Sequence, residues 1–92
     1  MRDFPKEVAS LKAQHEAGIE NITVKAGVLF QIARTSEVAL RDFKQAEHYY
    51  RLVATECSFD KRAYFARLRA DELARGKIES DYAPPLPPKE GE

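Results

Sequence analysis

The stretch FQIARTSEVALRDFKQAEHYY, residues 30–50, decides the fold, because it lies mid-chain and contains neither Gly nor Pro. A turn at Thr35–Glu37 or at Arg41–Asp42 would divide it into two helices, whereas no turn would leave one long helix. Apolar and small side chains recur at steps of three or four residues through this stretch and beyond both of its ends. They are Val24, Val28, Ile32, Thr35, Ala39, Phe43, Ala46, Tyr50, Val53 and Cys57. This unbroken register predicts a nearly continuous central helix. If it breaks, we expect the break at Thr35–Ser36 and least expect one at Arg41–Asp42.

The segment just before this stretch also allows a β-hairpin. IENITVKAGVLFQIAR, residues 19–34, is rich in β-branched residues, and its apolar positions alternate as in a strand. Gly27 would then turn the hairpin. The alternative fold is therefore α+β, with a hairpin at about 20–33 between a first helix and the central helix. The continuous register favours the helix, although Gly27 inside it costs about 1 kcal/mol.

Capping signals place a shorter helix on each side of the central one. Asp3 and Pro5 are typical of a helix start and Gly18 of its end, which predicts a helix over about 4–17. A last helix is expected over 61–75, ended by Gly76. We therefore predict an all-α, three-helix arrangement with a long central helix, forming a single small domain over 1–79. The segment SDYAPPLPPKEGE predicts an extended Pro-rich tail over 80–92.

Composition indicates a soluble protein with no broad affinity for nucleic acid. Fifteen Lys and Arg balance fifteen Asp and Glu, giving zero net charge, and 43% of residues are apolar. The longest apolar run is far below the ~20 residues that span a bilayer, so no membrane association is expected. Cys57 is the single cysteine, which excludes an intrachain disulfide. Together with the lack of a signal peptide, this predicts a cytoplasmic protein.

The residues that carry chemistry do not form a recognisable constellation. His15 and His48 lie far apart in sequence and lack metal-ligand spacing, and Cys57 is expected to serve in packing. The sequence has no G-x-S-x-G, Gly-rich phosphate loop or H-E-x-x-H motif. We therefore predict a protein that is not an enzyme and needs no cofactor or metal.

Residues 31–43, QIARTSEVALRDF, resemble a helix-turn-helix, which would span about 29–48. The resemblance implies that Arg41, Lys44 and Gln45 of the second helix face a DNA major groove. Glu37 departs from the pattern, because Gly or Asn normally occupies that turn position. A small DNA-binding transcriptional regulator is thus the alternative function, and nucleic acid is not the favoured partner.

Two further resemblances cover other parts of the chain. Residues 42–78 are similar to a second tetratricopeptide helix followed by the next first helix, although 27–41 lack the expected pattern and no full repeat is present. We interpret this as antiparallel helices joined by a short turn. In the tail, Pro84, Pro87 and Lys89 resemble a ligand of SH3-type domains, for which a stiff tail is the simpler interpretation.

The aromatic residues suggest where a partner binds. Tyr49, Tyr50, Tyr64 and Phe65 gather around the last turn, and one member of each adjacent pair must point away from a one-sided core. Two short helices also cannot cover a long central one, which leaves apolar surface for another chain. We therefore predict a non-enzymatic protein–protein interaction module, a small regulatory adaptor, chaperone or inhibitor of a larger partner. Its partner would be another protein or a second copy of itself, and the predicted surface comprises Tyr49, Arg51, Tyr64 and Arg67.

Overall fold

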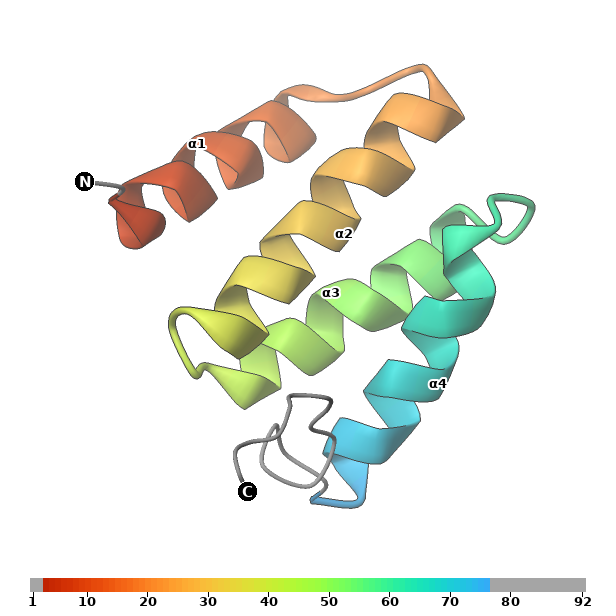
Figure 1. The fold of residues 1–92 in the computed structure, drawn as a ribbon. Coiled ribbons are helices and arrows are strands. Elements are labelled where there is room, and N and C mark those ends of the chain that lie inside the picture. Colours follow the sequence, from red (N-terminus) through yellow and green to blue (C-terminus); the bar gives the residue numbers. More distant parts are fainter. Residues whose placement is uncertain (1–2, 77–92) are drawn as a thin grey trace, which may run out of the picture.

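The computed structural model describes residues 3–76, which form four α-helices and contain no strand (Figure 1). They are α1 (Phe4–Ala17), α2 (Ile22–Val38), α3 (Phe43–Glu56) and α4 (Arg62–Ala74). The prediction of an all-α fold is confirmed, and the flanking helices begin and end within a residue of their predicted bounds. The Pro-rich tail predicted over 80–92 lies outside the described residues.

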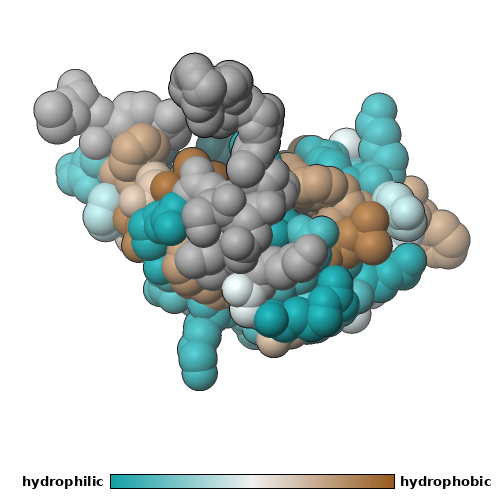
Figure 2. All heavy atoms as spheres, turned by 60° about the horizontal axis from the view of Figure 1, so that its bottom comes forward, coloured by the Kyte–Doolittle hydropathy of each residue, from teal (hydrophilic) through white to brown (hydrophobic). Residues whose placement is uncertain are grey.

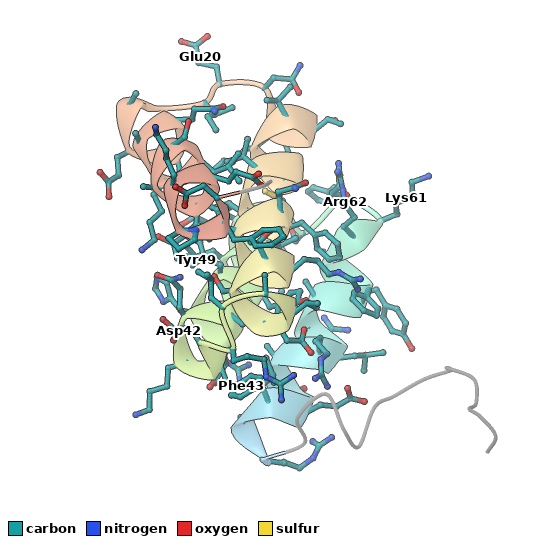
Figure 3. The ribbon with its side chains drawn as sticks, turned by 60° about the vertical axis from the view of Figure 1, so that its left-hand side comes forward. Glu20, Asp42, Phe43, Tyr49, Lys61 and Arg62 are labelled. Carbon is teal, nitrogen blue, oxygen red and sulfur yellow. The ribbon has the colours of Figure 1, made fainter. Side chains whose placement is uncertain are left out.

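The chain runs back and forth, so that each helix packs against the next one (Figure 1). The α2–α3 pair forms the centre, with α1 packed against α2 and α4 packed mainly against α3. Seen from the side in Figure 3, α2 lies in front, with α1 on one side of it and α4 on the other. One face of α2 therefore lies between α1 and α4, and these two helices do not form a packed pair with each other.

The prediction of three helices with one long central helix is wrong, because the chain turns at 39–42. Arg41 takes a positive φ of 56°, a left-handed conformation that ends the helical path. The Asp42 N–H donates to the Ser36 carbonyl at 2.8 Å, which closes the end of α2. The Asp42 side chain then accepts the Gln45 N–H at 3.2 Å and begins α3. The apolar register continues across the turn, but its two halves are buried in different places. Val28 and Ile32 of α2 pack with α1, whereas Ala46, Tyr50 and Val53 of α3 pack with α2 and α4.

The alternative hairpin at about 20–33 is also wrong, because α2 occupies nearly all of that segment. The Asn21 side chain begins the helix by accepting the Val24 N–H at 3.1 Å. Gly27 lies inside the helix, where an added Cβ would be 3.2 Å from Nη1 of Arg62. The glycine that suggested a hairpin turn instead makes room for a side chain from α4.

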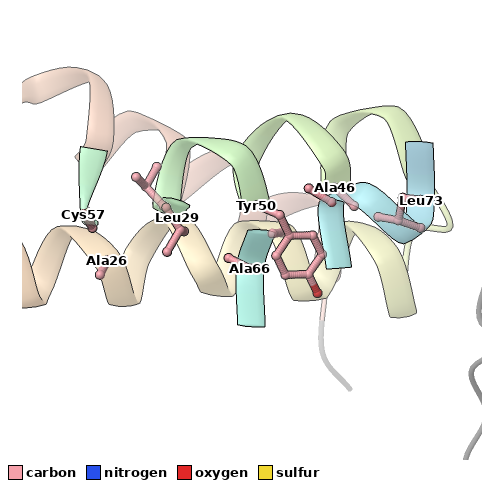
Figure 4. Packing of buried hydrophobic residues seen from close by; sticks show 10 residues of the cluster. Ala26, Leu29, Ala46, Tyr50, Cys57, Ala66 and Leu73 are labelled. Carbon is pink, nitrogen blue, oxygen red and sulfur yellow. The ribbon is translucent and has the colours of Figure 1, made fainter. Parts of the chain in front are cut away.

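The core consists of two clusters that share α2. The larger cluster joins α2, α3 and α4, and the Tyr50 ring lies within it near Leu29, Ala46 and Ala66 (Figure 4). Small residues at these helix contacts let the backbones approach closely. The second cluster fastens α1 through Val8, which packs with two residues of α2. The first helix is thus held by its own smaller set of apolar contacts.

Candidate functional site

A buried polar network fastens α2, α3 and α4 together. Glu37 accepts the Tyr50 hydroxyl on Oε1 at 2.8 Å and Nε of Arg69 on Oε2 at 2.8 Å. A second nitrogen of the same guanidinium, Nη2, also donates to this carboxylate oxygen. Nη1 of Arg69 donates to Glu72 at 2.7 Å. Because Glu37 and Arg69 are each 1% exposed, we assign this network to the structure rather than to a binding surface.

Hydrogen bonding governs the charge of the buried Arg69. Burial by itself would lower the pKa of its guanidinium, but the hydrogen bonds to Glu37 and Glu72 outweigh this effect and raise the pKa. The guanidinium therefore stays charged. No sequence pattern predicted the pairing of Glu37 with Arg69, because the two residues lie in different helices, 32 residues apart.

A groove runs along the open face of α2. It consists of two adjoining hollows, of about 610 Å³ and about 270 Å³, that share Gln31. We call it the α2 groove, and its lining comprises Phe4, Glu7, Ser10 and Leu11 of α1, Val24, Gly27, Val28, Phe30, Gln31, Arg34, Thr35 and Val38 of α2, Ala39, and Arg62 of α4. Its size falls within the range of sites that hold a ligand or a segment of another chain.

The floor of the α2 groove is a regular helical row. Val24, Gly27, Gln31, Arg34 and Val38 follow one another at alternating steps of three and four residues. The two valines at its ends, one in the first turn of α2 and one at its last residue, are 53% and 44% exposed, so both ends of the row present apolar side chains to solvent. The hydropathy surface in Figure 2, which brings the bottom of Figure 1 forward, shows apolar patches among hydrophilic side chains on that face of the molecule.

Arg62 forms one end of the groove, where α4 begins (Figure 3). Its Nε donates to Asp60 at 2.8 Å, and its Nη2 donates to the Thr23 carbonyl of α2 at 3.1 Å. The remaining nitrogen, Nη1, points toward Gly27. The Arg62 guanidinium and backbone N–H lower the pKa of the Asp60 carboxyl from 3.8 to about 2. Arg62 is therefore held in place while one of its nitrogens faces the groove.

The four residues predicted to bind a partner lie in different surroundings. Tyr49 is half-buried and its ring lies edge-on to His15 of α1, with centroids 6.4 Å apart. Arg51 pairs with Glu47 of α3 and with Asp71 of α4. Tyr64 and Arg67 are exposed on α4. Tyr49 thus faces α1, while Arg51 bridges α3 and α4, and the role of all four residues in binding a partner stays a prediction.

The residues of the DNA-binding alternative follow a turn that differs from the expected one. Thr35–Glu37, the expected turn, is inside α2, and the actual turn lies at 39–42. The Arg41 guanidinium lies over the Phe43 ring at 5.1 Å, and the Gln45 side chain donates to the Ser36 hydroxyl at 2.8 Å. Lys44 is exposed. Of the three, Arg41 and Gln45 thus have contacts within the protein, and their role toward DNA stays a prediction.

The histidine and cysteine side chains lie apart from the α2 groove. Cys57 is 1% exposed, and burial raises the pKa of its thiol. His15 of α1 faces the Tyr49 ring of α3. Its Nδ1 is buried and has no hydrogen-bond partner within residues 3–76. In that same part of the chain, no three His, Cys, Asp or Glu side chains converge as metal ligands would. Nor is any of its helices both long and apolar enough to cross a membrane.

Comparison with known proteins gives one partial likeness. Over 69 residues, or 75% of the chain, the sequence is 30% identical to a serine/threonine-protein kinase ATG1 from Komagataella pastoris. The matched part amounts to 9% of that kinase, so the chain spans less than a tenth of its relative's length. No protein-family model matches the chain, and no solved structure does.

Proposed function

We propose that this protein is a non-enzymatic interaction module whose α2 groove receives a segment of a larger partner protein. The observation that carries the proposal is the exposed row on α2, because valines at both its ends stay open to solvent between α1 and α4. Exposed apolar side chains in a groove with a polar rim are typical of surfaces that bind other proteins. The small adaptor or inhibitor predicted from the sequence would act through this groove.

The partial likeness to a kinase is compatible with such a module. The chain contains no G-x-G-x-x-G loop, H-R-D or D-F-G motif, which are signatures of protein-kinase catalysis. In this proposal, the likeness therefore concerns a part of the kinase outside its catalytic machinery. A segment of this size suits an independently folding helical unit that tethers one protein to another.

The test compares two matched variants on the same helix. Val24→Asp places a charge in the groove, whereas Ile22→Asp places the same charge at a similarly exposed apolar position that does not line it. Both positions lie in the first turn of α2, where an acidic residue is tolerated. The wild type and both variants would be used to capture proteins from the native host, and each captured protein would then be purified and titrated.

We expect Val24→Asp to weaken binding of the true partner about tenfold or more, while Ile22→Asp leaves it within about twofold. Circular dichroism melts of all three proteins would establish that folding is intact. A purified partner that binds all three proteins equally would show that the α2 groove is not its site and would refute the proposal. Sedimentation over a concentration series would reveal whether a second copy is the partner.

A further inference from the structure

The chemistry of the groove also indicates what kind of segment it binds. We infer that the occupant is an amphipathic helix of a partner protein, which carries carboxylates along one edge of its apolar stripe. This inference rests on the proposed function and specifies the partner for the same groove.

The shape of the α2 groove favours a helix. Its floor follows the three–four spacing with which helices pack, and α2, with 17 residues, is about 25 Å long. The first helix already packs against a neighbouring face of α2 through Val8, Val28 and Ile32. A helix of four to five turns, about 16–18 residues, would lie beside α1 and extend the existing array of helices.

A second copy is a poorer occupant than a single helix. Two copies that met through their α2 faces would bring two hollows together, each holding several hundred cubic ångströms. Such a pairing would leave unfilled volume, whereas stable interfaces are packed about as densely as protein interiors. A single helix is convex and fills a hollow of this kind.

The polar groups on the α2–α4 side of the groove are hydrogen-bond donors. The exposed guanidinium of Arg34 has neither an ion pair nor a hydrogen bond within residues 3–76, and Nη1 of Arg62 makes no hydrogen bond there either. Gln31, with its amide, lies between them on the floor. Because Asp60 already pairs with Arg62, the guanidinium of Arg34 is the group that calls for a carboxylate on the bound segment, and Nη1 of Arg62 is a further donor on that side.

The opposite wall of the groove offers no cation. Its lining residues from α1 are Phe4, Glu7, Ser10 and Leu11, and none of them is basic. The carboxylates of the partner therefore belong on the edge that faces Arg34 and Arg62. This asymmetry gives the bound helix one preferred rotation about its axis.

Apolar contact would supply most of the affinity. Phe30 lines the groove and packs on Phe65 of α4, with ring centroids 5.8 Å apart. Phe65 stays 38% exposed, so the apolar surface continues from the groove onto α4. Leucine or aromatic residues of the partner would contact Val24 and Phe30 at one end and Val38 at the other.

The experiment begins with a phage-displayed library of random 20-residue peptides selected on the full chain. Counter-selection on Val24→Asp removes peptides that bind elsewhere, and binding to Ile22→Asp serves as the matched control. We expect the surviving peptides to carry apolar residues at three–four spacing, with Asp or Glu along one edge. Circular dichroism of a synthetic survivor should show helix formation on binding.

A charge exchange then tests the acidic edge. The selected peptide and a twin with Lys in place of its acidic residues would be titrated against wild type, Arg34→Glu and Arg75→Glu. Arg75 is an exposed arginine at the end of α4 that does not line the groove. We expect Arg34→Glu to weaken the acidic peptide about tenfold and to strengthen the Lys twin, with Arg75→Glu within about twofold of wild type for both.

The contrary outcomes separate this inference from the proposed function. Peptides that require Val24 but are basic, or are extended and Pro-rich, would overturn the acidic helix and leave the binding groove intact. A dimer of the chain alone that Val24→Asp dissociates and Ile22→Asp does not would identify a second copy as the occupant and overturn the inference. If no peptide depends on Val24 and the chain is monomeric, both the inference and the proposed use of the groove are refuted.

Discussion

Glu37 of α2 and Arg69 of α4 form an ion pair in which both side chains are 1% exposed. The Tyr50 hydroxyl of α3 completes the coordination of the carboxylate at 2.8 Å. A buried pair of this kind is costly to desolvate, and it is tolerated here because hydrogen bonds satisfy the charged groups from three helices. The Glu37 carboxylate therefore joins α2 to both α3 and α4.

Removing one partner of this pair should be strongly destabilising. We expect Glu37→Ala to lower the free energy of unfolding by about 3–5 kcal/mol, because Arg69 keeps its charge in a buried site. The surface variant Glu47→Ala, which removes one of the two carboxylate partners of the partly exposed Arg51, should cost less than about 1 kcal/mol. Urea unfolding monitored by circular dichroism measures both changes.

A double variant keeps this prediction testable if Glu37→Ala fails to fold. Glu37→Met combined with Arg69→Met removes both charges and keeps similar volume, so it should recover most of the lost stability. A double variant as unstable as the single one would contradict the view that an unpaired buried charge causes the loss.

The left-handed backbone of Arg41 predicts a difference between two substitutions at the α2–α3 turn. Asn tolerates a φ of 56°, whereas Val is disfavoured there because its branched Cβ crowds the backbone. Both substitutions remove the contact of Arg41 with the Phe43 ring, so their difference isolates the backbone effect. We expect Arg41→Val to be less stable than Arg41→Asn by about 1–2 kcal/mol in thermal or urea unfolding. Equal stabilities would mean that the turn has another conformation.

Asp60 predicts an acid-sensitive contribution to stability. Its pKa falls from 3.8 to about 2 on folding, so its ionised form stabilises the folded state above pH 3.8. The contribution diminishes as the pH falls from about 4 to about 2, because protonation breaks the bonds to Arg62. We expect Asp60→Asn to be about 1 kcal/mol less stable than wild type at pH 7.

The difference in free energy of unfolding between the wild type and Asp60→Asn should shrink toward zero at pH 2 to 2.5, since the other acidic groups are common to both proteins. Urea midpoints at pH 7, 4 and 2.5 provide the comparison. A difference that stays constant over this range would show that the charge of Asp60 does not contribute.

The burial of Cys57 predicts slow reaction with thiol reagents. Reaction requires an accessible thiolate, but this side chain is 1% exposed and burial raises the pKa of its thiol. A disulfide reagent at pH 8 should modify the native protein about 100-fold more slowly than the urea-unfolded chain. The matched control, Cys57→Ala with Ser58→Cys, moves the thiol to an exposed position and should react rapidly in both states. Rapid modification of native Cys57 would indicate that the α3–α4 end of the core opens readily.

The sequence predicted the outer helices better than the central turn, for a local reason. Asp3 with Pro5 and Gly18 are strong boundary signals, and α1 begins and ends where they predict. At the centre, the apolar register concealed a helix start at Asp42. Asp42 was a recognisable capping residue, but a non-glycine residue at positive φ just before it has little local signature.

By itself, the sequence favoured a helical chain over one with a β-hairpin and determined where its outer helices begin and end. These features depend on side-chain periodicity and capping, which act over a few neighbouring residues. Only the tertiary structure decided that α2 and α3 fold back on each other and that Glu37 meets Arg69. The same holds for the α2 groove, whose walls come from α1 and α4, more than 40 residues apart in sequence. Such features depend on how helices pack, because residues distant in sequence become neighbours only when the apolar stripes are buried together.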